Sequence, residues 1–119
     1  MTIRELIPIL NAKVLLGEDQ LDQEVRSAFG SDLMSDVLAF VKDKTVLITG
    51  LTNVHVMRTA EMLDIHCVVF VRGKIPPQEV LEEAEELGIV VLATEYTCYT
   101  TCGLMYEAGI RGTNQRSGA

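Results

Sequence analysis

Apolar residues recur every three or four positions at the start of the chain, which is the spacing of an amphipathic helix. The residues that carry this pattern are Ile3, Leu6, Ile7 and Leu10. Thr2 and Glu5 have the spacing of a capping box, so we predict a helix over residues 3–11. Two short apolar segments then predict strands, residues 13–17 and residues 25–29.

Residues 30–40, GSDLMSDVLAF, have the pattern of a second helix. Ser31 or Asp32 is the expected N-cap, because short oxygen-bearing side chains accept hydrogen bonds from the first free amides of a helix. The apolar side chains expected along one face of this helix are Leu33, Val37 and Phe40.

Three runs of residues are almost continuously apolar and rich in β-branched side chains, namely 45–50, 66–71 and 89–94. Such runs are typical of strands covered on both faces, as in a parallel sheet. A helical pattern follows each run: Asn53 caps residues 53–63, Pro77 begins residues 77–88, and residues 97–108 form the last helix.

Strand and helix therefore alternate from residue 45 onward, which predicts right-handed βαβ units. The expected fold class is α/β, a three-layer α/β/α arrangement with a mostly parallel central sheet. The two N-terminal strands are expected to extend this sheet, with antiparallel pairing as an option at one edge. We expect a single domain over residues 1–110 and a polar, disordered tail over residues 111–119.

Composition and charge exclude several classes of protein. The 119 residues suit one domain, and 48% hydrophobic with 23% charged residues is ordinary for a globular chain. A net charge of −7 argues against partners that are nucleic acids or anionic membranes. The chain has no apolar run of about 20 residues and no signal-peptide pattern at its start, so we expect a cytoplasmic protein.

Three cysteines, an odd number, fit reduced thiols better than a disulfide framework. Cys98 and Cys102 share a helical stripe of small apolar residues, which suits packing on a sheet. A thiol-based redox or metal-binding protein that uses Cys98 and Cys102, with Cys67 as a third donor, is the alternative. No fourth cysteine exists for a zinc site, and Cys67 lies in mid-strand, so we predict no metal site and no cofactor.

A ligand is expected where the carboxyl ends of parallel strands meet. The loops at residues 50–53, 72–74 and 94–97 offer helix N-termini, hydroxyls and two cations there, which suits an anion. The predicted ligand contacts are Asn53, Arg72, Lys74 and Thr97. The same residues could serve only as caps and turns. No phosphate-binding glycine motif and no catalytic set is recognisable, so we expect no catalytic residues and no enzyme.

Residues 69–105, VFVRGKIPPQEVLEEAEELGIVVLATEYTCYTTCGLM, resemble the DRTGG domain family and, through it, the N-terminal domain of HPr kinase/phosphorylase. The earlier segment GSDLMSDVL is also similar. The Asp-Arg-Thr-Gly-Gly signature is absent, and LDIH stands in its place. Thr97 and Cys98 stand where many relatives have Asp-Thr.

The resemblance implies a compact α/β/α domain without catalysis, a regulatory or accessory module that tends to mediate dimerisation. Relatives are attached to phosphotransacetylases and CBS-domain pyrophosphatases, and the kinase site of HPr kinase lies in a separate P-loop domain that this chain lacks. We therefore expect a homodimeric regulatory domain that binds a small anionic metabolite or nucleotide, or docks on a partner enzyme. An enzyme whose site is completed across a dimer interface stays an open alternative.

Overall fold

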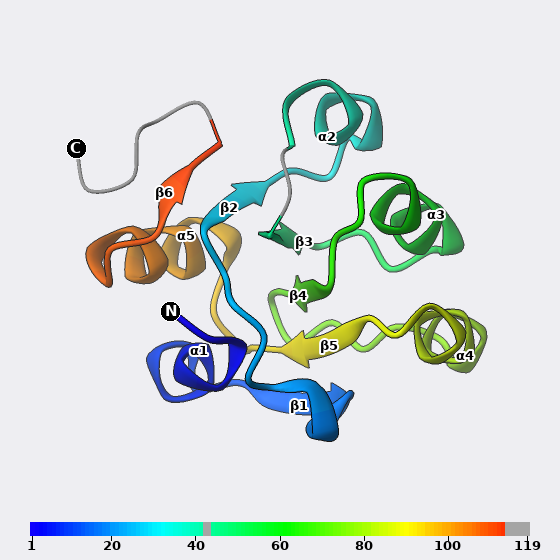
Figure 1. Ribbon diagram of the computed structural model, residues 1–119, viewed down its shortest axis with the longest axis horizontal. Coiled ribbons are helices and arrows are strands. Elements are labelled where there is room, and N and C mark those ends of the chain that lie inside the picture. Colours follow the sequence, from blue (N-terminus) through cyan, green and yellow to red (C-terminus); the bar gives the residue numbers. More distant parts are fainter. Residues whose placement is uncertain (42–43, 114–119) are drawn as a thin grey trace.

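A six-stranded sheet forms the middle of the computed structural model, which describes residues 1–41 and 44–113 (Figure 1). The strands are β1 (Lys13–Leu16), β2 (Ser27–Gly30), β3 (Thr45–Thr49), β4 (Cys67–Phe70), β5 (Val90–Ala93) and β6 (Arg111–Gly112). Their order in the sheet is β1-β5-β4-β3-β2-β6. Only β1 is antiparallel to its neighbour, and the other pairs are parallel. The predicted α/β class with a mostly parallel sheet is confirmed.

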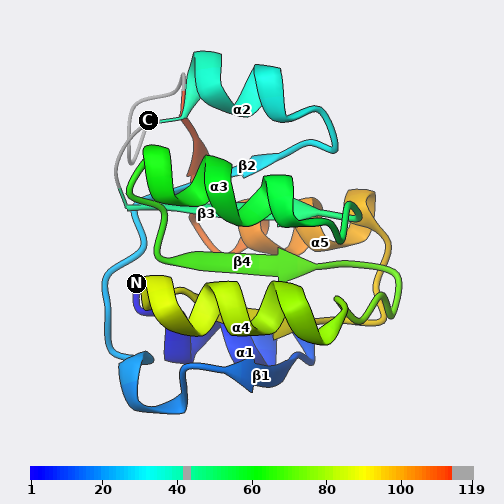
Figure 2. The ribbon, with the colours of Figure 1, turned by 90° about the vertical axis from the view of Figure 1, so that its right-hand side faces the viewer.

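Helices cover both faces of the sheet. They are α1 (Ile3–Leu10), the single 3-10 turn η1 (Glu18–Gln20), α2 (Met34–Phe40), α3 (Val54–Met62), α4 (Gln78–Leu87) and α5 (Cys98–Glu107). Helices α2, α3 and α4 lie on one face, and α1 and α5 lie on the other (Figures 1 and 2). This is the three-layer arrangement expected from the alternation of strands and helices.

Two apolar cores fill the layers, one on each side of the sheet. All residues of β3, β4 and β5 are buried, and successive side chains alternate between the two cores. In β3, for example, Val46 and Ile48 enter the core under α1 and α5, while Leu47 enters the core under α2, α3 and α4. A strand buried on both faces needs apolar residues at every position, which explains the unbroken runs in the sequence.

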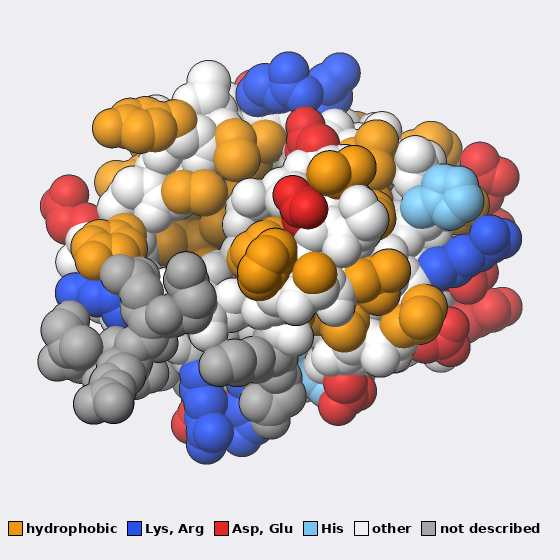
Figure 3. Space-filling view, turned by 90° about the horizontal axis from the view of Figure 1, so that it is seen from above, with side chains coloured by type: hydrophobic (Ala, Val, Ile, Leu, Met, Phe, Trp, Pro, Cys, Tyr) orange, Lys and Arg blue, Asp and Glu red, His pale blue; other side chains and the backbone are white. Residues whose placement is uncertain are grey.

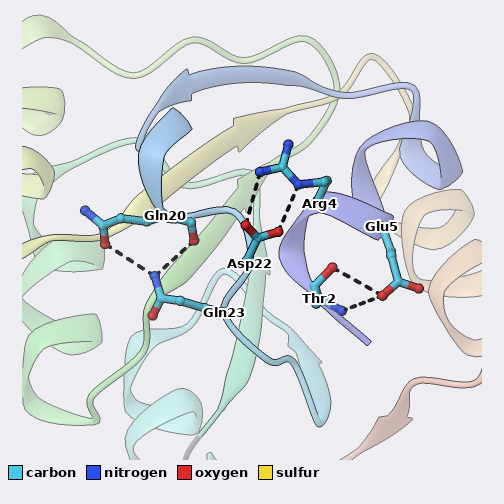
Figure 4. Close-up of polar contacts among 6 residues, drawn as sticks. All are labelled: Thr2, Arg4, Glu5, Gln20, Asp22 and Gln23. Atoms are coloured by element: carbon cyan, nitrogen blue, oxygen red, sulfur yellow. Dashed lines mark hydrogen bonds and ion pairs between the residues drawn. The ribbon is translucent and has the colours of Figure 1, made fainter.

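Polar contacts attach the first helix to the segment before β2 (Figure 4). The backbone N–H of Thr2 donates to Glu5 Oε1 at 3.1 Å, as the capping-box spacing predicts. Arg4 Nε lies 2.9 Å from Asp22 Oδ1, and this hydrogen bond, together with the charge of Arg4, lowers the pKa of Asp22. Gln23 Nε2 donates to a carbonyl of η1 at 3.2 Å. Of these contacts, the pair Arg4–Asp22 joins α1 to the segment before β2, while the buried Ile3, Leu6 and Leu10 pack α1 on the sheet.

Helix α2 differs from its predicted form at its start and on its face. Neither Ser31 nor Asp32 is the N-cap, because the cap is Leu33, whose amide donates to Ser31 Oγ at 3.0 Å in a local turn. Of the three apolar side chains expected on one face, only Val37 is buried. Leu33 and Phe40 are each 58% exposed, because α2 lies near the sheet edge and has little sheet beneath it.

Residues 111–113, which were expected to belong to a polar tail, have defined places in the fold. Arg111–Gly112 forms β6 beside Ser27 and Ala28, and Thr113 is buried, so the expectation of a disordered tail from residue 111 is wrong for these three residues. Arg111 Nη1 donates to the carbonyl of Tyr106 at 2.7 Å, and its guanidinium stacks 4.1 Å from the Tyr106 ring centroid. Residues 114–119 lie outside the described residues. In the described part of the chain, no helix is long and apolar enough to cross a membrane.

Candidate functional site

The carboxyl ends of β2, β3, β4 and β5 lie along one edge of the sheet, because these strands are parallel. We call this edge the rim, and it comprises residues 30–32, 49–53, 71–74 and 94–97. Backbone hydrogen bonds join its loops: the Arg72 amide donates to the Tyr96 carbonyl at 2.8 Å, and the Gly73 amide donates to the Thr94 carbonyl at 2.9 Å. The three loops expected to converge do so.

Arg72 extends over a glycine at the end of the neighbouring strand. A Cβ built on Gly50 would lie only 2.6 Å from Arg72 Nη2, so the absence of a side chain at Gly50 leaves room for the guanidinium. The backbone of Arg72 has φ 59°, a left-handed conformation that is uncommon outside glycine, asparagine and aspartate. Arg72 is exposed, as is Lys74 in the same loop, so the rim presents two cations to solvent.

Asn53 and Thr97 also reach the rim, and both side chains act as helix caps. Asn53 Oδ1 accepts from the His55 amide at 3.0 Å, and Thr97 Oγ1 accepts from the Thr100 amide at 3.5 Å. Capping of α3 and α5 is therefore enough to explain why Asn53 and Thr97 occupy these positions. Their role as ligand contacts stays a prediction, as does that of Arg72 and Lys74.

Two carboxylates, those of Asp32 and Glu95, lie on the same rim, and neither was predicted as a site residue. Asp32 Oδ1 accepts from Thr49 Oγ1 at 3.0 Å and from the Gly50 amide at 2.8 Å, so it links the end of β3 to the segment after β2. The Glu95 carboxylate lies against Gly73, where a Cβ would be 2.6 Å from Oε2. The available signal for both was a carboxylate two residues after the end of a parallel strand.

A cavity of about 250 Å³ opens between the rim and the start of β1. Its walls include Lys13, Gly73 and Glu95, so a cation of β1 and a carboxylate of the loop after β5 both line it. Ile75, which is 59% exposed, also lines it. Tyr96, in the loop after β5, and Tyr99, in the first turn of α5, are 38% and 88% exposed. Exposed tyrosine rings can stack on flat aromatic groups. Neither Lys13 nor the tyrosines were predicted as site residues.

The three cysteines have the burial of packed thiols. Cys98 Sγ and Cys102 Sγ are 4.0 Å apart and half-buried, and Cys67 is fully enclosed in β4. Burial raises the pKa of Cys67 to about 12, and burial followed by the neighbouring Cys98 raises that of Cys102 to about 11. Within residues 1–41 and 44–113, no group of three or more His, Cys, Asp or Glu side chains could hold a metal ion.

Comparisons with known proteins agree with this fold. A family model described as the DRTGG domain matches residues 5–108, which confirms the resemblance seen in the sequence. A crystal structure of the CBS and DRTGG domains of the regulatory region of Clostridium perfringens pyrophosphatase, complexed with the activator diadenosine tetraphosphate, is similar with a TM-score of 0.69 and 16% identity. The similarity covers 87% of this chain and 45% of that chain, so this chain spans less than half of its length. No curated protein matches.

Proposed function

Because this chain belongs to the DRTGG domain family, we propose that it is a non-catalytic regulatory domain that binds a nucleotide at the rim. The proposal includes a cytoplasmic location, which reduced thiols suit. The single observation that carries it is the placement of Arg72. Its guanidinium lies over the bare backbone of Gly50, in the same loop as the exposed Lys74, at the edge where parallel sheets bind ligands.

A nucleotide suits the rim better than a bare phosphate does. Several backbone amides that could hold phosphate already have partners, such as Gly50 with Asp32 and Tyr96 with Thr94 Oγ1. The carboxylates of Asp32 and Glu95 also oppose a simple anion. A ligand that sets its phosphates on the two cations and stacks its base on an exposed tyrosine gains from both kinds of group.

The similar structure supports a nucleotide as the ligand class, since the pyrophosphatase regulatory region was complexed with diadenosine tetraphosphate. That crystal structure contains CBS and DRTGG domains together, and the similarity covers 45% of its chain. Our proposal for this chain therefore rests on its own rim, and the relative contributes the class of compound to test first.

Docking on a partner enzyme is the second candidate, and the exposed apolar groups at the rim favour it. Ile75, which follows Lys74 in the chain, is 59% exposed, and Tyr99, in the first turn of α5, is 88% exposed. Aromatic residues and arginine are enriched in protein interfaces. We also infer a homodimer, for which the exposed apolar side chains of α2 provide a surface. These side chains, which we call the α2 surface, are Leu33, Leu38 and Phe40.

A thermal-shift screen with nucleoside monophosphates, nucleoside diphosphates and dinucleoside polyphosphates tests nucleotide binding. A compound at about five times its Kd stabilises the protein by about 1 kcal/mol, which is measurable as a rise in Tm. Arg72→Gln and Lys74→Gln should each reduce the rise. Arg58→Gln is the matched control, because it removes one exposed positive charge from α3 and lies outside the rim.

Two results would contradict nucleotide binding at the rim. The first is no rise in Tm with any nucleotide, which would leave docking as the supported function. The second is a rise that Arg72→Gln and Arg58→Gln reduce equally, because it would reflect net charge and not the rim.

A further inference from the structure

The cavity between the rim and the start of β1 has charged walls of both signs. Lys13 of β1 and Glu95 of the loop after β5 line it together with Gly73. Both charged side chains are exposed, and within residues 1–41 and 44–113 neither makes an ion pair or a side-chain hydrogen bond. An ammonium group and a carboxylate that line one cavity without pairing are both available to a ligand that carries an acceptor beside donors.

Gly73 connects this cavity to the cations of the rim. It stands between Arg72 and Lys74 in the chain, and it lines the cavity itself. Its φ of 67° is left-handed, and a Cβ at this position would lie 2.6 Å from Glu95 Oε2, so a side chain here would displace the carboxylate. A nucleotide whose phosphates lie on the two cations therefore has the cavity beside it to receive its base.

The size and the polar groups of the cavity suit one kind of base. Its volume is about 250 Å³, below the range of about 300–1,000 Å³ for pockets that enclose whole drug-sized ligands, so it suits a single base better than a whole nucleotide. The Watson–Crick edge of guanine carries the O6 acceptor beside the N1–H and N2–H donors. An ammonium group can donate to O6, and a carboxylate can accept from both N–H groups.

Adenine matches the same two side chains poorly. It has an N–H donor where guanine has O6, and it has a lone pair on N1 where guanine has N1–H. Lys13 would then face a donor, and the Glu95 carboxylate would face a lone pair. A well-placed pair of hydrogen bonds discriminates between bases by about tenfold to a hundredfold.

We propose that Lys13 and Glu95 make the rim selective for guanine nucleotides. This inference rests on the proposed binding of a nucleotide at the rim and adds the identity of the base. Lys13 Nζ donates to O6, and the Glu95 carboxylate accepts from N1–H and N2–H, while the phosphates lie on the cations of the rim. Ile75 lines the same cavity and offers an apolar contact to the face of the base.

Calorimetric titration of the full chain with guanosine, inosine and adenosine diphosphates tests the proposal, because inosine keeps O6 and N1–H and lacks the 2-amino group. We expect guanosine diphosphate to bind at least about tenfold more tightly than adenosine diphosphate, with inosine diphosphate between them. Glu95→Gln should bring the ratio of the guanosine and adenosine affinities close to one. Lys13→Met should weaken guanosine and inosine diphosphates more than adenosine diphosphate.

Glu86→Gln is the control for Glu95→Gln. Glu86 is exposed in the last turn of α4, which returns from the rim to the opposite end of the sheet. This variant removes the same charge and should keep the parent's ratio of guanosine to adenosine affinity. Circular dichroism checks that each variant is folded, and the comparison of nucleotides on the parent chain needs no variant.

The proposal is overturned if the parent chain binds adenosine diphosphate as tightly as guanosine diphosphate. A folded Glu95→Gln variant that keeps the parent's affinity ratio, or an equal fall of that ratio in Glu86→Gln, also overturns it. Binding of all three nucleotides without a preference contradicts only the selectivity and leaves nucleotide binding at the rim in place. Absence of binding for all three contradicts both.

Discussion

Glycines at the rim determine where its charged side chains can lie. Gly50 leaves room for the Arg72 guanidinium, and Gly73 leaves room for the Glu95 carboxylate. The sequence identified Arg72 as a candidate from its place after a buried strand. It did not indicate that Gly50 lies beneath it, because these residues are far apart in the chain and meet only when β3 pairs with β4.

Replacing Gly50 with alanine should separate ligand binding from stability. The new Cβ would lie 2.6 Å from Arg72 Nη2, and the flexible end of the arginine can move away. We expect stability within about 0.5 kcal/mol of the parent and about tenfold weaker binding of the best nucleotide, or about 1.4 kcal/mol. Chemical denaturation and calorimetric titration measure the two quantities. Unchanged affinity would show that the position of Arg72 does not matter for the ligand.

The buried thiol of Cys67 should make the protein sensitive to alkali. Its pKa is raised from 9.0 to about 12 by burial, so the unfolded chain ionises this thiol first as the pH rises. The free energy of unfolding is therefore unaffected by this thiol below pH 9. It decreases as the pH rises toward 12, by at most about 4 kcal/mol. Denaturation curves of Cys67→Ala should therefore depend less on pH in this range than those of the parent. Parallel curves would refute this.

At the scale of elements, two glycines bear on α5 in opposite ways, one within the helix and one in the strand that it packs against. Gly103 lies in mid-helix with nothing within 4 Å of a built Cβ, whereas Gly30 of β2 lies directly against the sulfur atoms of α5. The sequence predicted a helix over residues 97–108, and α5 spans Cys98–Glu107 with Thr97 as its N-cap. It could not reveal which glycine contacts the thiols, since that depends on how α5 crosses the sheet.

The two alanine substitutions should change stability in opposite directions. Gly103→Ala should stabilise the protein by about 0.5–1 kcal/mol, because alanine restricts the unfolded chain and favours helix. Gly30→Ala should destabilise it by about 1–3 kcal/mol, because its Cβ would lie 2.9 Å from Cys102 Sγ in a packed layer. Urea denaturation of both variants checks the signs. A destabilised Gly103→Ala would mean that this face of α5 has a partner in solution.

At the scale of the whole molecule, apolar side chains are exposed on the face that carries α2. This face shows hydrophobic side chains spread among polar and charged ones (Figure 3). Helix α2 has seven residues and only Val37 buried, and the side chains of the α2 surface are 43–58% exposed although Phe40 also stacks on Phe29. An exposed patch of this kind is a common feature of interfaces between protein chains.

Light scattering should therefore give twice the mass of one chain, and Leu38→Lys should shift it toward the mass of a monomer. Leu38 is 43% exposed at the centre of α2, and a lysine there would place two like charges at a symmetric contact. Met62→Lys, at a 72% exposed position on α3, is the control. A dimer that persists in Leu38→Lys and dissociates in Met62→Lys would place the interface elsewhere.

The sequence by itself determined the kind and order of the main elements, the mostly parallel sheet and the loops that form the rim. Burial is periodic along the chain, and parallel strands separated by helices must align their carboxyl ends. Only the tertiary structure decided that Arg72 lies over Gly50, that Asp32 bonds to the end of β3, that Arg111–Gly112 pairs with β2, and that two sulfur atoms lie 4.0 Å apart against Gly30. The physical reason is that these features depend on how the elements pack in space, and the pattern of apolar residues along a chain does not record such packing.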